Sequence, residues 1–178
     1  MNEMKDYTFV KSLEDYKNIF SKNIGFFTAY DDPIQKNFGR EPSLEDIIEA
    51  TIEKLKNFDK PFFILVEGSQ IDWAEHDNDQ EYLLSEMLEF DKAVDVSYKY
   101  AIENKNTLVI VTADHETGGA AIVSGDLEKQ IVKINYSSDE HTSEMVPVFS
   151  IGPYSEKFKG VYDNTEIFNK LFEIVKEW

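Results

Sequence analysis

One short stretch of sequence decides the fold: Thr107-Leu108-Val109-Ile110-Val111-Thr112, followed at once by Ala113-Asp114-His115. A second stretch, Pro61-Phe62-Phe63-Ile64-Leu65-Val66, has the same character and leads into Glu67-Gly68. Each apolar run is too short for a helix, and continuous apolar residues are typical of a parallel-sheet strand that is buried on both faces. The two stretches therefore predict central strands whose ends carry polar side chains.

Helical patterns lie between and after these strands. Ser43-Leu44-Glu45-Asp46 resembles a capping box, and apolar residues then recur at three- and four-residue steps as far as Leu55. A long helix is predicted from about residue 80 to residue 103, and Asn164 is expected to cap a last helix. Because strands alternate with helices, we expect an α/β fold, a layered and mainly parallel sheet flanked by helices. We expect residues 1–178 to form a single domain.

Shorter elements complete the prediction. We expect a short helix from Ser12 to about Phe20, a strand at 24–29, a loop at 30–41, a hairpin of 120–124 and 131–136 around Gly125-Asp126, and a strand at 147–151.

The composition excludes several classes of protein. The chain of 178 residues is 42% apolar and carries a formal net charge of −17, which disfavours binding to nucleic acid or to an anionic membrane surface. No apolar run approaches the ~20 residues that span a bilayer, and the N-terminus has no basic start followed by an apolar run, so no signal peptide is expected. Since there is no cysteine, any metal must be held by Asp, Glu or His.

Candidate ligands gather near the ends of the two apolar stretches. Asp72 and His76 are four residues apart, so a helix would place them on one face, close enough to hold one ion. Asp114 and His115 follow the other stretch, and Gly118 and Gly119 make the turn that both would need plausible. Taken alone, each pair is more readily explained otherwise, the first as a surface contact and the second as a loop whose aspartate caps the next element.

The third histidine, His141, precedes the strand predicted at 147–151, and Glu67 ends the strand predicted at 61–66. Three histidines with Asp72 and Asp114 would suit two zinc sites, and Glu67 would be left for a harder cation such as magnesium.

Three segments carry a resemblance to a known family. Residues 66–76, VEGSQIDWAEH, resemble the VEG-x-x-ID-x-x-x-H motif of alkaline phosphatases, and residues 112–119, TADHETGG, resemble another motif of that family. Residues 141–148, HTSEMVPV, resemble the HT-G-x-x-VPV segment, although Ser143 stands where the family usually has glycine. The three follow in the family's order and spacing, and the likeness extends from about Gly25 to the end of the chain.

The resemblance implies a role for each matching residue. Asp72, His76 and His141 would bind a first zinc ion, Asp114 and His115 a second, and Glu67 magnesium; Trp73 would lie near the phosphate, or simply pack on a neighbouring helix. In this family a serine attacks the phosphorus of a phosphate monoester and forms a phosphoserine between two zinc ions. The resemblance therefore implies a partial alkaline-phosphatase-like fold and phosphate monoesters as substrates. It also implies a periplasmic or extracellular location.

The family's nucleophile lies in an Asp-Ser-Ala motif, which does not occur in this sequence. The family's phosphate-binding arginine is also upstream, and Arg40, the only arginine here, lies in a different place. We therefore expect this chain to be inactive by itself, a C-terminal portion that keeps a full ligand set only for the first zinc ion. If the predicted strands are left partly uncovered, we expect the chain to self-associate, for example as a homodimer.

Two alternatives stay open. Phosphomutases of the same superfamily also carry a TADH sequence, although residues 67–76 and the HETGG continuation favour a phosphatase. The second alternative is a non-enzymatic metal-binding domain that kept the ligands without the nucleophile.

Overall fold

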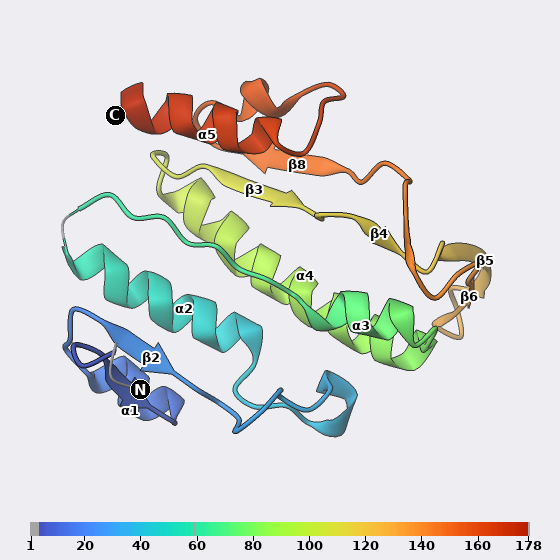
Figure 1. The fold of residues 1–178 in the computed structure, drawn as a ribbon, viewed down its shortest axis with the longest axis horizontal. Coiled ribbons are helices and arrows are strands. Elements are labelled where there is room, and N and C mark those ends of the chain that lie inside the picture. The colour runs from blue at the N-terminus through green and yellow to red at the C-terminus, as the bar shows by residue number, and fades with distance from the viewer. Residues whose placement is uncertain (1–3, 59, 178) are drawn as a thin grey trace.

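The computed structural model describes residues 4–58 and 60–177. Its central element is the long helix α4 (Gln80–Glu103), which matches the bounds that the sequence predicts. Asp79 begins this helix, because its carboxylate accepts from the backbone N–H groups of Glu81 and Tyr82 at 3.0 Å each. Helix α2 (Leu44–Leu55) lies along one side of α4 and begins with the predicted capping box, in which the Ser43 and Asp46 side chains bind each other's backbone N–H (Figure 1).

On the other side of α4 lies a pair of strands, β3 (Val109–Thr112) and β8 (Val148–Ile151), with helix α5 (Glu166–Glu177) beyond them (Figure 1). Strand β1 (Thr8–Val10), helix α1 (Leu13–Asn18) and strand β2 (Ile24–Phe26) form the N-terminal unit, beyond α2. Helices and strands therefore mix in layers, and the predicted α/β class is confirmed.

The predicted parallel sheet is not what these residues form. The described strands make four two-stranded sheets, of which only β1–β2 is parallel. Strand β3 pairs with β8 in antiparallel register, with Val111 opposite Phe149. A run of apolar residues predicts extended backbone with two apolar faces, but it does not specify the direction of the neighbouring strand, and on this point the prediction was wrong.

The predicted strand at 61–66 is also absent, since no strand lies beside it within the described residues. This segment runs extended across α4, and its half-buried Ile64 and Val66 pack on Ile48 and Ile52 of α2 and Ala93 of α4. Phe62 also faces α4, with its ring centroid 6.4 Å from that of Tyr100, whereas Phe63 and Leu65 are 71% and 83% exposed. The stretch has the shape of a strand without the hydrogen bonds of one.

The predicted hairpin forms with its turn displaced. Strands β5 (Ala121–Asp126) and β6 (Ile131–Asn135) are antiparallel, and the turn covers 127–130 rather than Gly125-Asp126. Asp126 stabilises this turn, because its carboxylate accepts from the Lys129 N–H at 3.0 Å. The Asx-type contact outweighs the glycine as the turn signal.

A buried ionic cluster ties the loop before α2 to α4. Arg40 donates to Glu86 at 3.0 and 2.5 Å and also bonds Glu89, while the Lys36 ammonium lies 3.1 Å from Glu89. Glu86 and Glu89 are 5% and 4% exposed. Burial acts to raise the pKa of Glu89, but hydrogen bonds from Arg40 and Lys36 outweigh it and leave that pKa below its usual value. Because buried charges are tolerated only when they are paired, this cluster fixes the loop.

The described part of the chain has no helix with the length and apolar character that crossing a membrane would require.

Candidate metal centre

Helix α3 (Gln70–His76) carries the first pair of candidate ligands. As the spacing of four predicts, Asp72 and His76 share a face, and the Asp72 Oδ1 to His76 Nε2 distance is 3.4 Å. The position of α3 is set by Ala74, which is 0% exposed and packs on Tyr82 and Leu83 of α4. A small side chain at Ala74 lets the two helices approach closely, so helix packing places this pair.

Two very short strands bring in the other histidines. Strand β4 (Glu116–Thr117) pairs antiparallel with β7 (His141–Thr142), so that Thr117 lies opposite His141. The rings of His115 and His141 are stacked, with centroids 3.6 Å apart. The pairing of β4 with β7 therefore joins residues from two segments that the sequence separates.

Glu116 holds this turn in shape. Its carboxylate accepts from the backbone N–H groups of Gly119 and Ala120, at 3.2 and 3.0 Å, and from the Thr142 hydroxyl. Burial would raise the pKa of Glu116, but these hydrogen bonds outweigh it and lower that pKa. Gly119 has a φ of +56°, and a Cβ at this position would lie 2.0 Å from the Ser137 hydroxyl oxygen, so the turn requires glycine.

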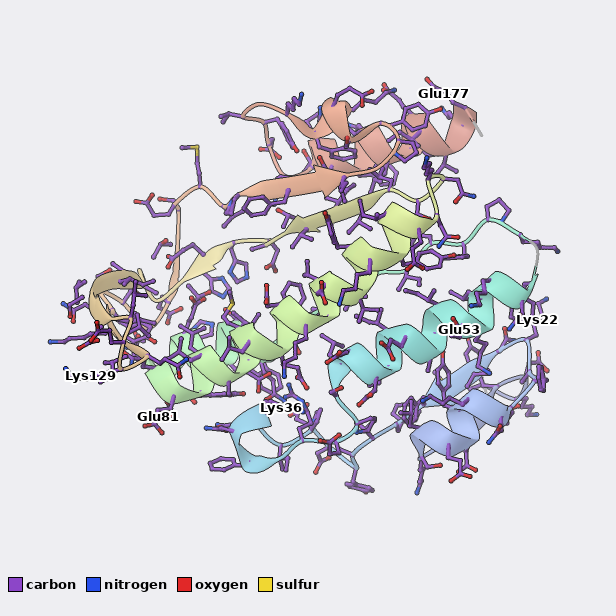
Figure 2. The ribbon with its side chains drawn as sticks, turned by 180° about the vertical axis from the view of Figure 1, so that it is seen from behind. Lys22, Lys36, Glu53, Glu81, Lys129 and Glu177 are labelled. Atoms are coloured by element: carbon purple, nitrogen blue, oxygen red, sulfur yellow. The ribbon has the colours of Figure 1, made fainter. Side chains whose placement is uncertain are left out.

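Four of the six predicted ligands converge. One ligand atom each from Asp72, His115 and His141 lies within 4.8 Å of the others. The His76 Nε2 atom lies 3.1 Å from the His141 Nε2 atom, which is itself 3.5 Å from Asp72 Oδ1. In Figure 2, helix α3 and strand β4 lie at the end of the molecule marked by Glu81 and Lys129.

The hydrogen bonds around the cluster leave electron-pair donors facing one another, with no positive charge between them. The His76 Nδ1 atom lies 2.6 Å from the Asp139 carbonyl oxygen, which can only accept, so the proton sits on Nδ1 and the lone pair of a neutral ring on Nε2. That lone pair faces a second imidazole nitrogen and a carboxylate oxygen. The contact with Asp139, together with the charges of Asp72 and Glu140, raises the pKa of His76.

The surroundings are strongly negative as well. Burial, with the nearby charges of Glu116 and Asp72, raises the pKa of Glu75 to about 7. Imidazole nitrogen and carboxylate oxygen in this arrangement suit a transition-metal ion such as zinc. The residues present therefore fit a metal ion at Asp72, His76, His115 and His141.

The geometry does not separate two zinc sites in the way that the resemblance implies. His115, expected in the second site, lies with Asp72 and His141 of the first. Asp114 is 85% exposed and reaches the cluster only through His115, whose Nε2 atom is 3.2 Å from Asp114 Oδ2. The assignment of each ligand to one ion stays a prediction.

Glu67 lies outside the cluster. It is exposed at the end of the 61–67 segment and lines a separate cavity of about 140 Å³, together with Arg40, Glu86 and Glu89. No group of three converging ligand side chains within the described residues includes it. Trp73 follows Asp72 on α3 and is 40% exposed, so its indole is available at the surface.

Sequence reasoning missed the residue that joins the cluster together, Thr117. This side chain is 1% exposed, its hydroxyl donates to Asp72 Oδ1 at 2.6 Å, and the same oxygen lies 3.2 Å from His115 Nδ1. One hydroxyl therefore orients a ligand from α3 and a ligand from the β4 turn. A threonine two residues after a histidine gives no signal of this kind, because the contact with Asp72 spans 45 positions of the chain.

Comparison with known proteins connects this geometry to one family. The family model described as Alkaline phosphatase matches residues 4–129 and 120–177. Alkaline phosphatase 4 of Bacillus subtilis is 30% identical over a span of 241 positions that covers 96% of this chain and 52% of the relative. Streptomycin-6-phosphate phosphatase of Streptomyces griseus is 32% identical over an alignment that covers 76% of this chain and 36% of that relative.

A solved structure gives the same result for the fold. The alkaline phosphatase of the Antarctic bacterium TAB5 matches 98% of this chain with a TM-score of 0.89 and 35% identity, and 54% of that enzyme is covered. A mutant of the TAB5 enzyme was solved with magnesium bound in its M3 site.

The match to these relatives is partial in two respects. This chain spans about half the length of the relatives it matches over nearly all its residues. The aligned span of 241 positions is also longer than the 178 residues of this chain, so the B. subtilis enzyme has residues within the span that this chain lacks. The two segments of the family match overlap over residues 120–129, which include β5 and lie between Asp114-His115 and His141. With both sequence and fold matched along almost its whole length, the chain belongs to the alkaline phosphatase family.

Proposed function

We propose that this chain is the metal-binding part of an alkaline phosphatase that hydrolyses phosphate monoesters with two zinc ions and a phosphoserine intermediate. The observation that carries the proposal is the convergence of Asp72, His76 and His141, with His115 stacked on His141. Membership in the family supports the reaction class. When bound, a pair of zinc ions supplies positive charge for the oxygens on both sides of a phosphorus atom during in-line displacement.

Each residue of the chain has a defined part in this proposal. The Asp72 carboxylate and the Nε2 atoms of His76 and His141 hold the first ion, and His115 with Asp114 contributes to the second. The Asp139 carbonyl keeps the proton of His76 on Nδ1 and so keeps Nε2 free to bind a metal. The Thr117 hydroxyl fixes the direction of the Asp72 carboxylate.

The nucleophile and the phosphate-binding arginine are proposed to come from residues outside this sequence. No Asp-Ser-Ala motif is present, and Arg40 is engaged with Glu86 and Glu89. We extend the proposal to magnesium at Glu67, which would need further ligands from the same source. As the family resemblance implies, the enzyme would work in the periplasm or outside the cell.

A chimera tests the function. The part of B. subtilis alkaline phosphatase 4 that this chain does not match is fused ahead of residue 4, and release of phosphate is measured on several simple phosphate monoesters with zinc and magnesium supplied. We expect hydrolysis by the chimera, none by the isolated chain, and a loss of at least about 100-fold in the chimera with Asp72→Asn. Glu128→Ala, which removes an exposed carboxylate at the β5–β6 turn, serves as the control. Isomerisation of one phosphorylated substrate without release of phosphate would instead indicate a mutase.

A further inference from the structure

The extended segment 61–66 has one covered side and one bare side. Ile64 and Val66 turn inward onto α2 and α4, where they pack on Ile48, Ile52 and Ala93. Phe63 and Leu65 alternate with them and are 71% and 83% exposed. Alternation of this kind is the geometry of a β-strand, but here both sets of side chains are apolar. A strand with two apolar sides belongs in the interior of a layered fold.

The backbone of the same segment is free. Among the described residues, no strand pairs with 61–67, and no backbone hydrogen bond joins this segment to another part of the chain. Strand β3, which like the segment lies against α4, pairs with β8 on one edge only. Both run in the same direction along α4 (Figures 1 and 2). Free backbone edges of this kind pair readily with another strand.

We propose that segment 61–66 is a docking edge for an apolar β-strand from polypeptide outside this sequence, namely from the half of the fold that the relatives possess and this chain does not. The TAB5 enzyme superposes on 98% of this chain, yet only 54% of that enzyme is used in the match. A second copy of this chain is a poorer occupant, because each copy carries a net charge of −17 and the copies repel each other. The docked strand would hydrogen-bond to the free edge and cover Phe63 and Leu65.

The absence of cysteine from this chain allows a direct test. A single thiol is introduced as Leu65→Cys, and its labelling rate with a maleimide is measured in the isolated chain and in the chimera described above. Leu127→Cys is the matched control, since Leu127 is 98% exposed in the β5–β6 turn. We expect equal rates at both positions in the isolated chain. In the chimera we expect the rate at position 65 to fall by on the order of 100-fold, with position 127 unchanged.

Two results would overturn the proposal. One is an unchanged labelling rate at position 65 in the chimera. The other is protection that rises with the concentration of the isolated chain, which would make a second copy the occupant. Hydrogen exchange of the amides of 62–66, measured on the chain without a substitution, gives the same comparison should the cysteine disturb packing. Neither readout uses metal or activity, so a failed docking edge is distinguishable from a failed phosphatase assignment.

Discussion

The two apolar stretches of this sequence have similar composition, but only one of them forms a paired strand. Residues 109–112 of the first stretch form β3, which pairs with β8 and leads into the turn that carries His115. Residues 61–66 pair with nothing in the described chain, and Glu67 after them is left in solvent. The comparison teaches that an apolar run specifies an extended backbone with apolar faces, whereas a neighbouring strand has to be supplied from elsewhere in the fold.

The candidate ligands follow the same division. His115 is positioned by strand pairing, through β4 and β7. Asp72 and His76 are positioned by helix packing, because Ala74 seats α3 on α4 immediately after the unpaired stretch. The candidate ligands can therefore converge even though one of the two flanking apolar stretches has no partner strand.

The largest effect on stability is expected at α4, the helix against which both apolar stretches lie. Arg40→Met leaves the buried Glu86 and Glu89 on α4 without their main partner, and we expect the free energy of unfolding to fall by about 3–5 kcal/mol. Lys99→Met removes an exposed ion pair with Asp95 from the same helix and should cost less than about 1 kcal/mol. Urea unfolding followed by circular dichroism measures both, and equal losses would show that the cluster does not hold α4.

The same cluster predicts an acid sensitivity. The pKa of Glu89 is lowered in the folded chain, so its contribution to stability is present above the unfolded value of about 4.5 and is lost as the pH falls through the folded value. We expect the free energy of unfolding to decrease with acid below about pH 4.5. In Glu89→Gln this dependence should be shallower. A variant with an acid profile as steep as that of the unsubstituted chain would assign the sensitivity to other carboxylates.

The helices and the first pair of candidate ligands could be predicted from the sequence, because they depend on local signals. The Asp79 cap and the helical period fix α4, and the spacing of Asp72 and His76 places both on one face of α3. The pairing direction of β3 and the missing partner of 61–66 could not be predicted, since they depend on segments far away or outside the sequence. The roles of Thr117 and of the Asp139 carbonyl depend equally on distant contacts.

A smaller effect sharpens the comparison at the metal cluster. Thr117→Val removes the hydroxyl that orients Asp72 and His115, and we expect zinc affinity to fall by about 10–100-fold. Thr117→Ser keeps the hydroxyl and should keep most of the affinity. Calorimetric titration compares the two, with urea unfolding as a check that both variants are folded. If valine and serine bind zinc equally, Thr117 is only a packing residue.

The smallest effect concerns the unpaired stretch itself. In the isolated chain, Leu65→Ala should change the free energy of unfolding by less than about 0.5 kcal/mol, because Leu65 is 83% exposed. Ile64→Ala, one residue away and packed on α2 and α4, should cost about 2 kcal/mol. Urea unfolding of the pair measures the difference. Similar losses at both positions would mean that the outward face of the stretch is already covered in solution.

The most direct test of the central claim is a zinc titration of the isolated, metal-free chain by calorimetry, with His76→Ala beside it and Glu128→Ala as the control. The account predicts one tight equivalent of zinc in the unsubstituted chain and in the control, lost in His76→Ala, because Asp72, His76 and His141 already converge within this chain. No specific binding by a chain that circular dichroism shows to be folded, or equal binding by His76→Ala, would contradict it.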